Sequence, residues 1–321
     1  MASPRRSEAD PASPVPGPGS GPPSPPHPGP DPAWQISRIT SATAASQSPP
    51  PPRQRTTEPP TTASIPRTLW RLTIPLYITH PSLPNTPFIT SLPRVSYLSL
   101  LLPRIRAFLP PSTPVPTSFH HEGIALRALP LGLLVDLYQP ALPWRLTVQE
   151  GDDWHVGDTF LNGVKEADFV RNGHAKQIMG MSKADTTALW NAVRDADYPA
   201  WARINARLLN PSTPIKHVPL RIYIPSSGGG NGGAGTGGAP PAGSFRVMQT
   251  LVPPKMANRT PQTLGPTLRD LLPALFPSSR DPVLANVVLH GAPVPFSAPL
   301  EGLMREAAYP DGWLCLTVVP L

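Results

Sequence analysis

The sequence predicts an α+β protein: two copies of one small mixed α/β module, one on each side of a helical segment, after a Pro-rich N-terminal extension. Three observations carry this prediction: an internal sequence echo, helical periodicity between its two halves, and proline and glycine concentrated outside them. The chain has 321 residues, of which 51 are proline and 24 are glycine. Because these residues gather in particular stretches, the folded part is shorter than the chain.

The echo links the middle of the chain to its end. The segments PLGL (130–133) and WRLTV (144–148) recur as PLEGL (299–303) and WLCLTV (313–318). The two leading prolines are 169 residues apart, and so are the two tryptophans. Such a constant register indicates that one structural unit occurs twice.

Each copy begins with two apolar runs and a helical stretch, and continues as strand, short strand, short helix and strand. The opening segments are IPLYITH, PFITSLP and SYLSLLLPRIRAFL in the first copy, and HVPLRIYIP, SFRVMQTLVP and TLGPTLRDLLPALF in the second. This order is typical of the ubiquitin-like β-grasp fold, in which a hairpin, a crossover helix and a final central strand form a mixed sheet. The apolar run LCLTVVPL fits such a central strand.

Between the copies the apolar residues follow a helical period. Asp158 is expected to cap a first helix that stops at Asn172-Gly173, and Ser182 with Asp185 has the form of a capping box for a second. A third helix is expected to begin at Pro199. The apolar stripes of the three helices are Phe160, Leu161, Val164 and Ala167; Ala188, Leu189, Ala192 and Val193; and Trp201, Ile204 and Leu208.

These patterns divide the chain into four parts. Residues 1–64 are expected to be a disordered Pro-rich extension, 65–150 the first ubiquitin-like domain, 151–212 a helix-rich domain, and 213–321 the second ubiquitin-like domain. Residues 226–243 within the last are expected to be a flexible Gly-rich loop. The loop contains G-x-G-x-x-G, but a dinucleotide-binding motif opens a helix, and here glycines and a Pro-Pro pair follow, so no cofactor is expected.

Charge and cysteine content narrow the classes of function. The formal net charge is +7, but the basic residues are scattered and form no basic arm, so no nucleic-acid partner is expected. The single cysteine, Cys315, excludes a disulfide within the chain and points to a reducing compartment. Without a signal-peptide pattern or an apolar run of about 18 residues, we expect a cytoplasmic protein with peripheral membrane contact.

Few groups suggest catalysis. The eight histidines are scattered, and His120 and His121, as neighbours on a strand, point to opposite faces, so no metal site is expected. The motifs GxSxG, GxxxxGK[ST] and HExxH are absent. Cys315 lies in the most apolar strand, where a thiol is normally a core residue. We therefore assign no catalytic residue and do not expect an enzyme.

One lysine stands out in a chain where arginine supplies most of the positive charge. Lys165 falls on the first central helix, about 100° around the helix from the centre of the apolar stripe. Spacing alone makes it an ordinary solvated surface lysine.

The matched segments resemble the autophagy protein 5 family, in a form similar to that of filamentous fungi. The resemblance extends from about residue 65 to 321 and implies two ubiquitin-like domains around a helix-rich domain, in agreement with the internal echo. The Pro-rich extension and the Gly-rich loop depart from the family core without touching its motifs. The segments that carry the resemblance are LPRVSYLSLLLPRIRAF, GIALRALPLGLLVDLY, ALPWRLTV, VKEAD, KADTTALW, HVPLRIY, TLRDLLPALFP and PLEGLMREAAYPDGWLCLTVVP.

The resemblance implies conjugation. In that family a ubiquitin-like modifier, autophagy protein 12, is joined through its C-terminal glycine to a lysine on the first helix of the central domain. Lys165, in VKEAD, occupies that position, with Lys176 as the nearest rival and Lys183 as a weaker one. The thioester comes from enzymes resembling autophagy proteins 7 and 10, and Glu166 and Asp168 are expected to serve solubility.

The conjugate is expected to bind autophagy protein 16 noncovalently and to act in E3-like fashion. It would promote transfer of autophagy protein 8 to phosphatidylethanolamine by a conjugating enzyme resembling autophagy protein 3, at the preautophagosomal structure membrane. Two alternatives stay open: a generic β-grasp adaptor that recruits SH3-type partners through its proline runs, and an enzyme of unrecognised type.

Overall fold

The structure is a computed structural model that describes residues 64–152, 155–210, 213–226 and 244–321. All of these lie in one compact unit, residues 59–321. The expected disordered extension, apart from Ser64, and all but the first residue of the Gly-rich loop fall outside the described residues. No described helix is both long enough and apolar enough to cross a membrane.

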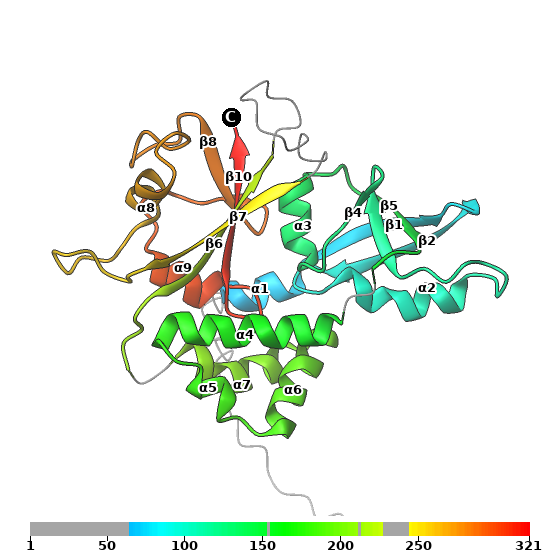
Figure 1. Cartoon of the computed structure of the whole chain (residues 1–321), viewed down its shortest axis with the longest axis horizontal. Coiled ribbons are helices and arrows are strands. Elements are labelled where there is room, and N and C mark those ends of the chain that lie inside the picture. The colour runs from blue at the N-terminus through cyan, green and yellow to red at the C-terminus, as the bar shows by residue number, and fades with distance from the viewer. Residues whose placement is uncertain (1–63, 153–154, 211–212, 227–243) are drawn as a thin grey trace, which may run out of the picture. The chain divides into compact units, whose positions relative to one another are not determined.

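The first module is a five-stranded mixed sheet with the order β2-β1-β5-β3-β4 (Figure 1). Its last strand is central, parallel to β1 and antiparallel to β3. The crossover is a short 3-10 turn that leads into α2, and α3 precedes the central strand. The elements are β1 (Thr73–His80), β2 (Leu83–Pro93), η1 (Leu98–Leu101), α2 (Leu102–Phe108), β3 (Ser118–His121), β4 (Ile124–Ala125), α3 (Leu131–Tyr138) and β5 (Trp144–Gln149).

The second module repeats this topology with the order β7-β6-β10-β8-β9. Its central strand is again the last one, parallel to β6 and antiparallel to β8. The elements are β6 (Val218–Pro225), β7 (Phe245–Val252), α8 (Leu264–Leu271), β8 (Ala285–Leu289), β9 (Ala292–Pro293), α9 (Leu300–Ala307) and β10 (Leu314–Pro320). The predicted ubiquitin-like order of elements is therefore confirmed in both copies.

The two sheets differ in what covers them. Along β5 buried and more exposed residues alternate, whereas β10 is buried on both faces from Leu314 to Val318. The additional cover of the second sheet comes from α4 (Val156–Asn172), which packs against β6, and from α3 of the first module, which packs against β10. Figure 1 shows α4 lying between the second sheet and the other helices of the middle segment.

The echoed tryptophans, despite their equal spacing, are not structural equivalents. Trp144 is the register partner of Leu76 and belongs to the core of the first module. Trp313 precedes β10, and its indole N–H donates to the carbonyl of Gly163 on α4. Trp144 therefore points toward the core helices of its sheet, and Trp313 points to the opposite face of the other sheet.

The middle segment forms the helical bundle expected from its periodicity, with some different ends. Helix α4 begins after His155, so Asp158 lies in its first turn and is not its cap; it ends at Gly173, whose φ is +73°. The Ser182 side chain caps α6 by accepting from the N–H of Asp185, as predicted. The bundle elements after α4 are α5 (Lys176–Met179), α6 (Lys183–Arg194) and α7 (Tyr198–Leu209).

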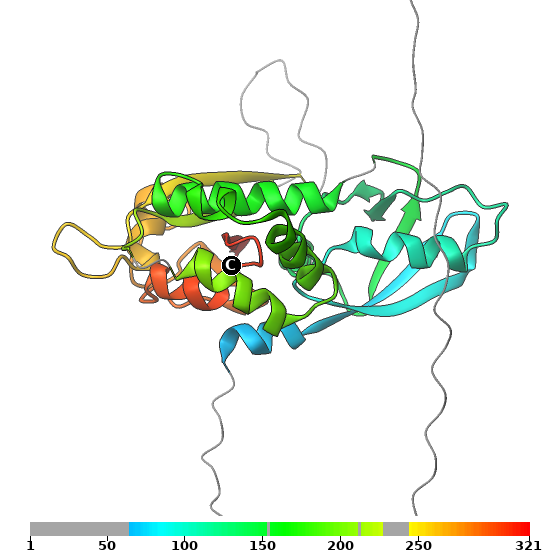
Figure 2. The same ribbon diagram turned by 90° about the horizontal axis from the view of Figure 1, so that it is seen from below.

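Three further details differ from the expectation. Asp197 caps α7, so Pro199 occupies the second helical position. Ala188, placed in an apolar stripe by spacing, is exposed, while Leu189, Ala192 and Val193 are buried as expected. Two short helices escaped prediction, α5 and α1 (Ile65–Arg71). Figure 2, seen from below, shows α1 beside α9, which it contacts.

Candidate functional site

The candidate site is built on α4, whose inner face packs into two separate hydrophobic cores. Phe160 and Val164 belong to the core of the helical bundle. One and two turns further on, Ala167 and Val170 belong to the core of the second ubiquitin-like module. The helix is thereby fixed on its inner side over most of its length, and the outer side remains for contact with other molecules.

Lys165 lies on the outer side of α4 and is exposed. Within the described part of the chain no carboxylate lies within ion-pair distance of its amine. One helical turn away, on the same side, Phe169 leaves 58% of its surface exposed. The structure thus presents an unpaired primary amine beside an exposed apolar side chain.

The carboxylate next to this lysine is already engaged. Glu166 forms an ion pair with Arg221 of β6 at 2.5 Å. The Arg221 guanidinium also lies over the ring of Trp313, 3.8 Å from its centroid, and donates to Gln249 at 3.2 Å. Glu166 therefore connects α4 to the second sheet.

Asp168, which we expected to serve solubility, has a structural role instead. It is fully buried, accepts from the side-chain amide of Asn172 at 2.7 Å, and accepts from the backbone N–H of Ile178 at 3.0 Å. A buried carboxylate with these bonds joins α4 to α5 and cannot act at the surface. The expectation was wrong because spacing on the helix does not reveal how the next loop folds back.

A cavity of about 260 Å³ lies beside Glu166 and Arg221, between the two modules and α4. Asp311 lines it, and burial raises the pKa of its carboxyl to about 6 although Arg221 and Arg171 act in the opposite direction. Cys315 lines it too; burial, and then the nearby Asp311, raise the pKa of its thiol. A thiol that stays protonated fits the inert core role predicted for it.

The rival lysines are exposed, like Lys165. Lys176 is the first residue of α5 and Lys183 the first of α6, and both are exposed. Exposure therefore does not separate the three candidates. The remaining lysines, Lys216 and Lys255, are also exposed and lie in or beside the second module.

The described residues contain no cluster of three or more histidine, cysteine or carboxylate side chains that could bind a metal ion. His120 is placed between Ser118 and Gln149, at 2.9 and 3.1 Å, while the His121 ring accepts from the indole of Trp144 at 3.1 Å. The two neighbouring histidines thus have separate polar partners.

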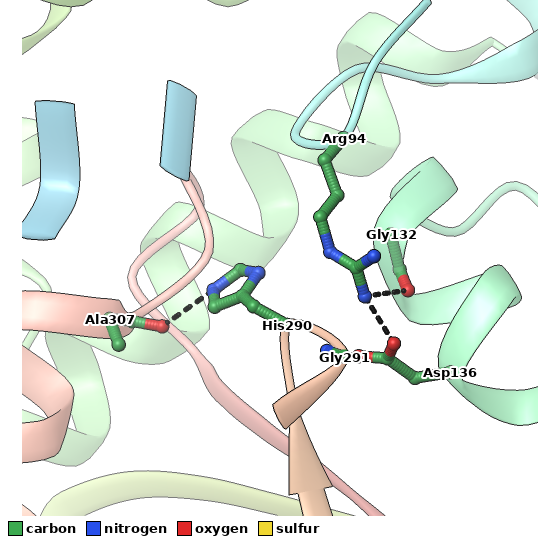
Figure 3. A network of polar contacts seen from close by, with 6 residues as sticks. All are labelled: Arg94, Gly132, Asp136, His290, Gly291 and Ala307. Carbon is green, nitrogen blue, oxygen red and sulfur yellow. Dashed lines mark hydrogen bonds and ion pairs between the residues drawn. The ribbon is translucent and has the colours of Figure 1, made fainter. Parts of the chain in front are cut away.

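A buried polar network that the sequence patterns did not predict joins the modules (Figure 3). Arg94, just after β2, pairs with Asp136 of α3 and donates to the carbonyl of Gly132 at 3.0 Å. The other carboxylate oxygen of Asp136 accepts from the backbone N–H of Gly291 in the second module at 3.2 Å. The available signal was Asp136 within the apolar run LGLLVDLY.

A chain with two β-grasp modules, a helical bundle between them and an exposed lysine on the first bundle helix belongs to the class of paired ubiquitin-like proteins. Comparison with known families identifies which one. The family models for autophagy protein ATG5 match the chain as the UblA domain over residues 69–150, the alpha-helical bundle region over 155–211 and the UblB domain over 217–318. The chain therefore belongs to the autophagy protein 5 family, which gives it a role in autophagy.

Relatives and a solved structure agree with this assignment. Autophagy protein 5 of Pyricularia oryzae is 91% identical over 321 residues, the whole of both chains. Autophagy-related protein 5 of Neurospora crassa is 64% identical over 266 residues, covering 81% of this chain and 72% of that protein. The crystal structure of Kluyveromyces marxianus Atg5 matches with a TM-score of 0.61 at 21% identity, over 79% of this chain and 98% of that one, and supports the fold.

Proposed function

We propose that this chain is the non-catalytic acceptor of the ubiquitin-like modifier autophagy protein 12, and that the modifier is attached to Lys165. The observation that carries the proposal is an exposed amine, without an ion-pair partner among the described residues, on a helix anchored along its inner face. The family to which the chain belongs supports the identity of the modifier.

The transfer reaction requires only a reactive amine from the acceptor. The amine attacks the thioester carbonyl that joins the modifier's C-terminal glycine to a conjugating enzyme resembling autophagy protein 10. A carbon–nitrogen bond forms, the carbon–sulfur bond breaks, and the enzyme's cysteine leaves as a thiolate while the amine gives up a proton. An ordinary lysine with a pKa of about 10.4 is less than about 0.1% neutral at pH 7, so a base must accept this proton.

That base comes from the conjugating enzyme in our proposal. Glu166 is paired with Arg221 and Asp168 is buried under two hydrogen bonds, so neither neighbouring carboxylate is available. The acceptor contributes geometry: it presents the amine where the thioester can reach it.

The conjugate, with autophagy protein 16 bound noncovalently, would then act in E3-like fashion. It would stimulate an enzyme resembling autophagy protein 3 to transfer autophagy protein 8 to phosphatidylethanolamine. We place this step at the preautophagosomal structure membrane, which the cytoplasmic complex would contact peripherally.

Immunoblotting of cell extracts tests the acceptor role. We expect a slowly migrating species that survives boiling in detergent and thiol, disappears in Lys165→Arg and persists in Lys176→Arg and Lys183→Arg. Because the chain has five lysines, a variant that keeps only Lys165 provides a positive control. Mass spectrometry of the trypsin-digested conjugate then locates the branch.

Two results would contradict the proposal in different ways. If the band persists in Lys165→Arg and is lost in Lys176→Arg, the site is wrong and the acceptor role stands. If no covalent species forms from the wild-type chain with the modifier and its enzymes present, the acceptor role fails and a noncovalent adaptor remains.

A further inference from the structure

A turn of the second ubiquitin-like domain, residues 310–313, lies directly against the helix that carries Lys165. The indole N–H of Trp313 donates to the carbonyl of Gly163 at 3.0 Å. From the helix side, the guanidinium of Arg171 donates to the carbonyl of Gly312 at 3.3 Å. The turn is therefore bonded to α4 at two points, about two helical turns apart.

Two glycines allow this close approach. A Cβ atom on Gly163 would lie 3.0 Å from a carboxylate oxygen of Asp311. Gly312 has a φ of +87°, and a Cβ there would lie 2.6 Å from the Arg171 guanidinium and 3.4 Å from the methyl group of Ala167. A larger side chain at Gly163 would require Asp311 to shift, and one at Gly312 would require Arg171 to shift and would be strained by the positive φ.

The same turn also contacts, through Arg221, the residue that follows Lys165 in the sequence. Trp313 is the platform on which Arg221 stacks, and Arg221 is the ion-pair partner of Glu166. Lys165 thus lies between Gly163 and Glu166, and Trp313 contacts the first directly and the second through Arg221. The backbone of Lys165 is fixed while its side chain stays free.

A second helix of the bundle is tied to the turn as well. The indole N–H of Trp201 on α7 donates to the carbonyl of Pro310 at 3.2 Å. By contrast, no hydrogen bond in the described part of the chain joins the turn to α5 or α6, where Lys176 and Lys183 lie. The turn therefore distinguishes Lys165 from Lys176 and Lys183, which are also exposed.

We propose that the turn 310–313 is a positioning element that makes Lys165 the acceptor in preference to Lys176 and Lys183. This inference rests on the proposed conjugation at Lys165. Transfer requires the amine to come within about 3 to 3.5 Å of the thioester carbonyl, and a misplacement of about 1 Å can slow a reaction by about a hundredfold. A fixed helix backbone restricts the positions that a four-carbon side chain can sample.

The two echoed tryptophans supply a matched pair of variants for the test. Trp313→Phe and Trp144→Phe are the same substitution of a fully buried residue, and each removes one indole hydrogen bond, of 3.0 Å to Gly163 or 3.1 Å to His121. Only the first bond reaches α4. The comparison therefore separates positioning from a general loss of stability.

A glycine pair provides a second test that does not depend on tryptophan. Gly163→Ala places a methyl group against Asp311, whereas Gly302→Ala on α9 meets its nearest neighbour, Pro299, at 4.0 Å. Both substitutions raise helix propensity equally. Only the first should move the turn away from α4.

Single-turnover transfer to the full-length chain, from a conjugating enzyme charged with the modifier, is the measurement. For Trp313→Phe and Gly163→Ala we expect the maximal rate at Lys165 to fall about three- to tenfold with the half-saturating enzyme concentration unchanged. Mass spectrometry should show a larger share of branches at Lys176 and Lys183. Trp144→Phe and Gly302→Ala should match the wild type.

The inference is overturned if Trp313→Phe slows transfer no more than Trp144→Phe, or if the branch stays at Lys165 at the wild-type rate in Gly163→Ala. Failure of the underlying proposal looks different, because the wild-type chain itself would then carry its branch on another lysine or carry none.

Discussion

Asp136 binds both ubiquitin-like domains, since one carboxylate oxygen pairs with Arg94 in the first domain and the other accepts the backbone N–H of Gly291 in the second. The side chains of the ion pair are only 7% and 3% exposed. Next to Gly291, the ring of His290 contacts the carbonyl of Ala307 at 3.0 Å (Figure 3). Buried polar groups therefore link the two domains, in addition to the packing of α3 against β10.

Removal of the carboxylate should destabilise the whole chain. Asp136→Ala leaves the Arg94 guanidinium buried without its partner, and breaking a buried ion pair in this way costs about 3 to 5 kcal/mol. Chemical denaturation of the full chain measures the loss. The double variant Arg94→Met/Asp136→Leu, which removes both charges, should recover most of it; if it is as unstable as Asp136→Ala, the cost has another origin.

Two buried groups should give the stability opposite dependences on pH. The pKa of Asp311 is raised from 3.8 to about 6 by burial, so the folded chain binds a proton more tightly there than the unfolded chain does. The pKa of His290 is lowered from 6.5 to about 4, first by burial and also by Arg94, so the folded chain binds that proton less tightly. Each pKa shift corresponds to a pH-dependent contribution of about 3 kcal/mol to the free energy of unfolding.

Variants separate these contributions. Relative to Asp311→Asn, the wild type should gain up to about 3 kcal/mol in unfolding free energy as the pH falls from 7 to 4, because the buried carboxylate becomes neutral. Relative to His290→Asn, the wild type should lose a similar amount over the same range, because the unfolded histidine takes up a proton. Denaturant titrations at each pH give both differences, and equal signs would contradict the assignment.

The cysteine should behave as a core residue. Cys315 is 4% exposed and its thiol pKa is raised, so a thiol-specific reagent should modify it only when denaturant unfolds the chain. Cys315→Ala should cost about 1 kcal/mol and leave conjugation unchanged. Rapid labelling of the native chain would show that the strand opens far more readily than its burial implies.

Deletion of residues 1–63 should leave conjugation within about twofold of the wild type, because the contacts that the structure describes around α4 all come from residues 64–321. The family matches also begin after this segment, at residue 69. Immunoblotting of the truncated chain checks the covalent species. Loss of autophagy with conjugation intact would favour the alternative in which the proline runs recruit partners.

Much of the fold was predictable because most helices and strands have a local sequence pattern. Strand and helix periods indicated the order of elements in both modules, and the apolar run LCLTVVPL identified β10 as central. The cap at Ser182 was readable because its partner is three residues away. Interactions between residues this close in the sequence can be predicted without the tertiary structure.

The wrong predictions concern features that the local sequence does not determine. Asp158 lost the capping position because α4 continues back to Val156, and Asp168 became a buried acceptor for Ile178 because the chain folds back after Gly173. The equal spacing of Trp144 and Trp313 concealed a reversal of face, which a shift of one residue along a strand produces. Lys165 itself had no distinguishing local signal, and only the family resemblance selected it.

Helix α4 has no hydrophobic core of its own, since Phe160 and Val164 complete the bundle while Ala167 and Val170 complete the second domain. Neither folding unit is whole without it. Lys165 consequently occupies its final position only in a chain where both have formed, and a misfolded chain would be a poor acceptor. Attachment of the modifier at this helix would thus select for correctly assembled molecules before they enter any larger complex.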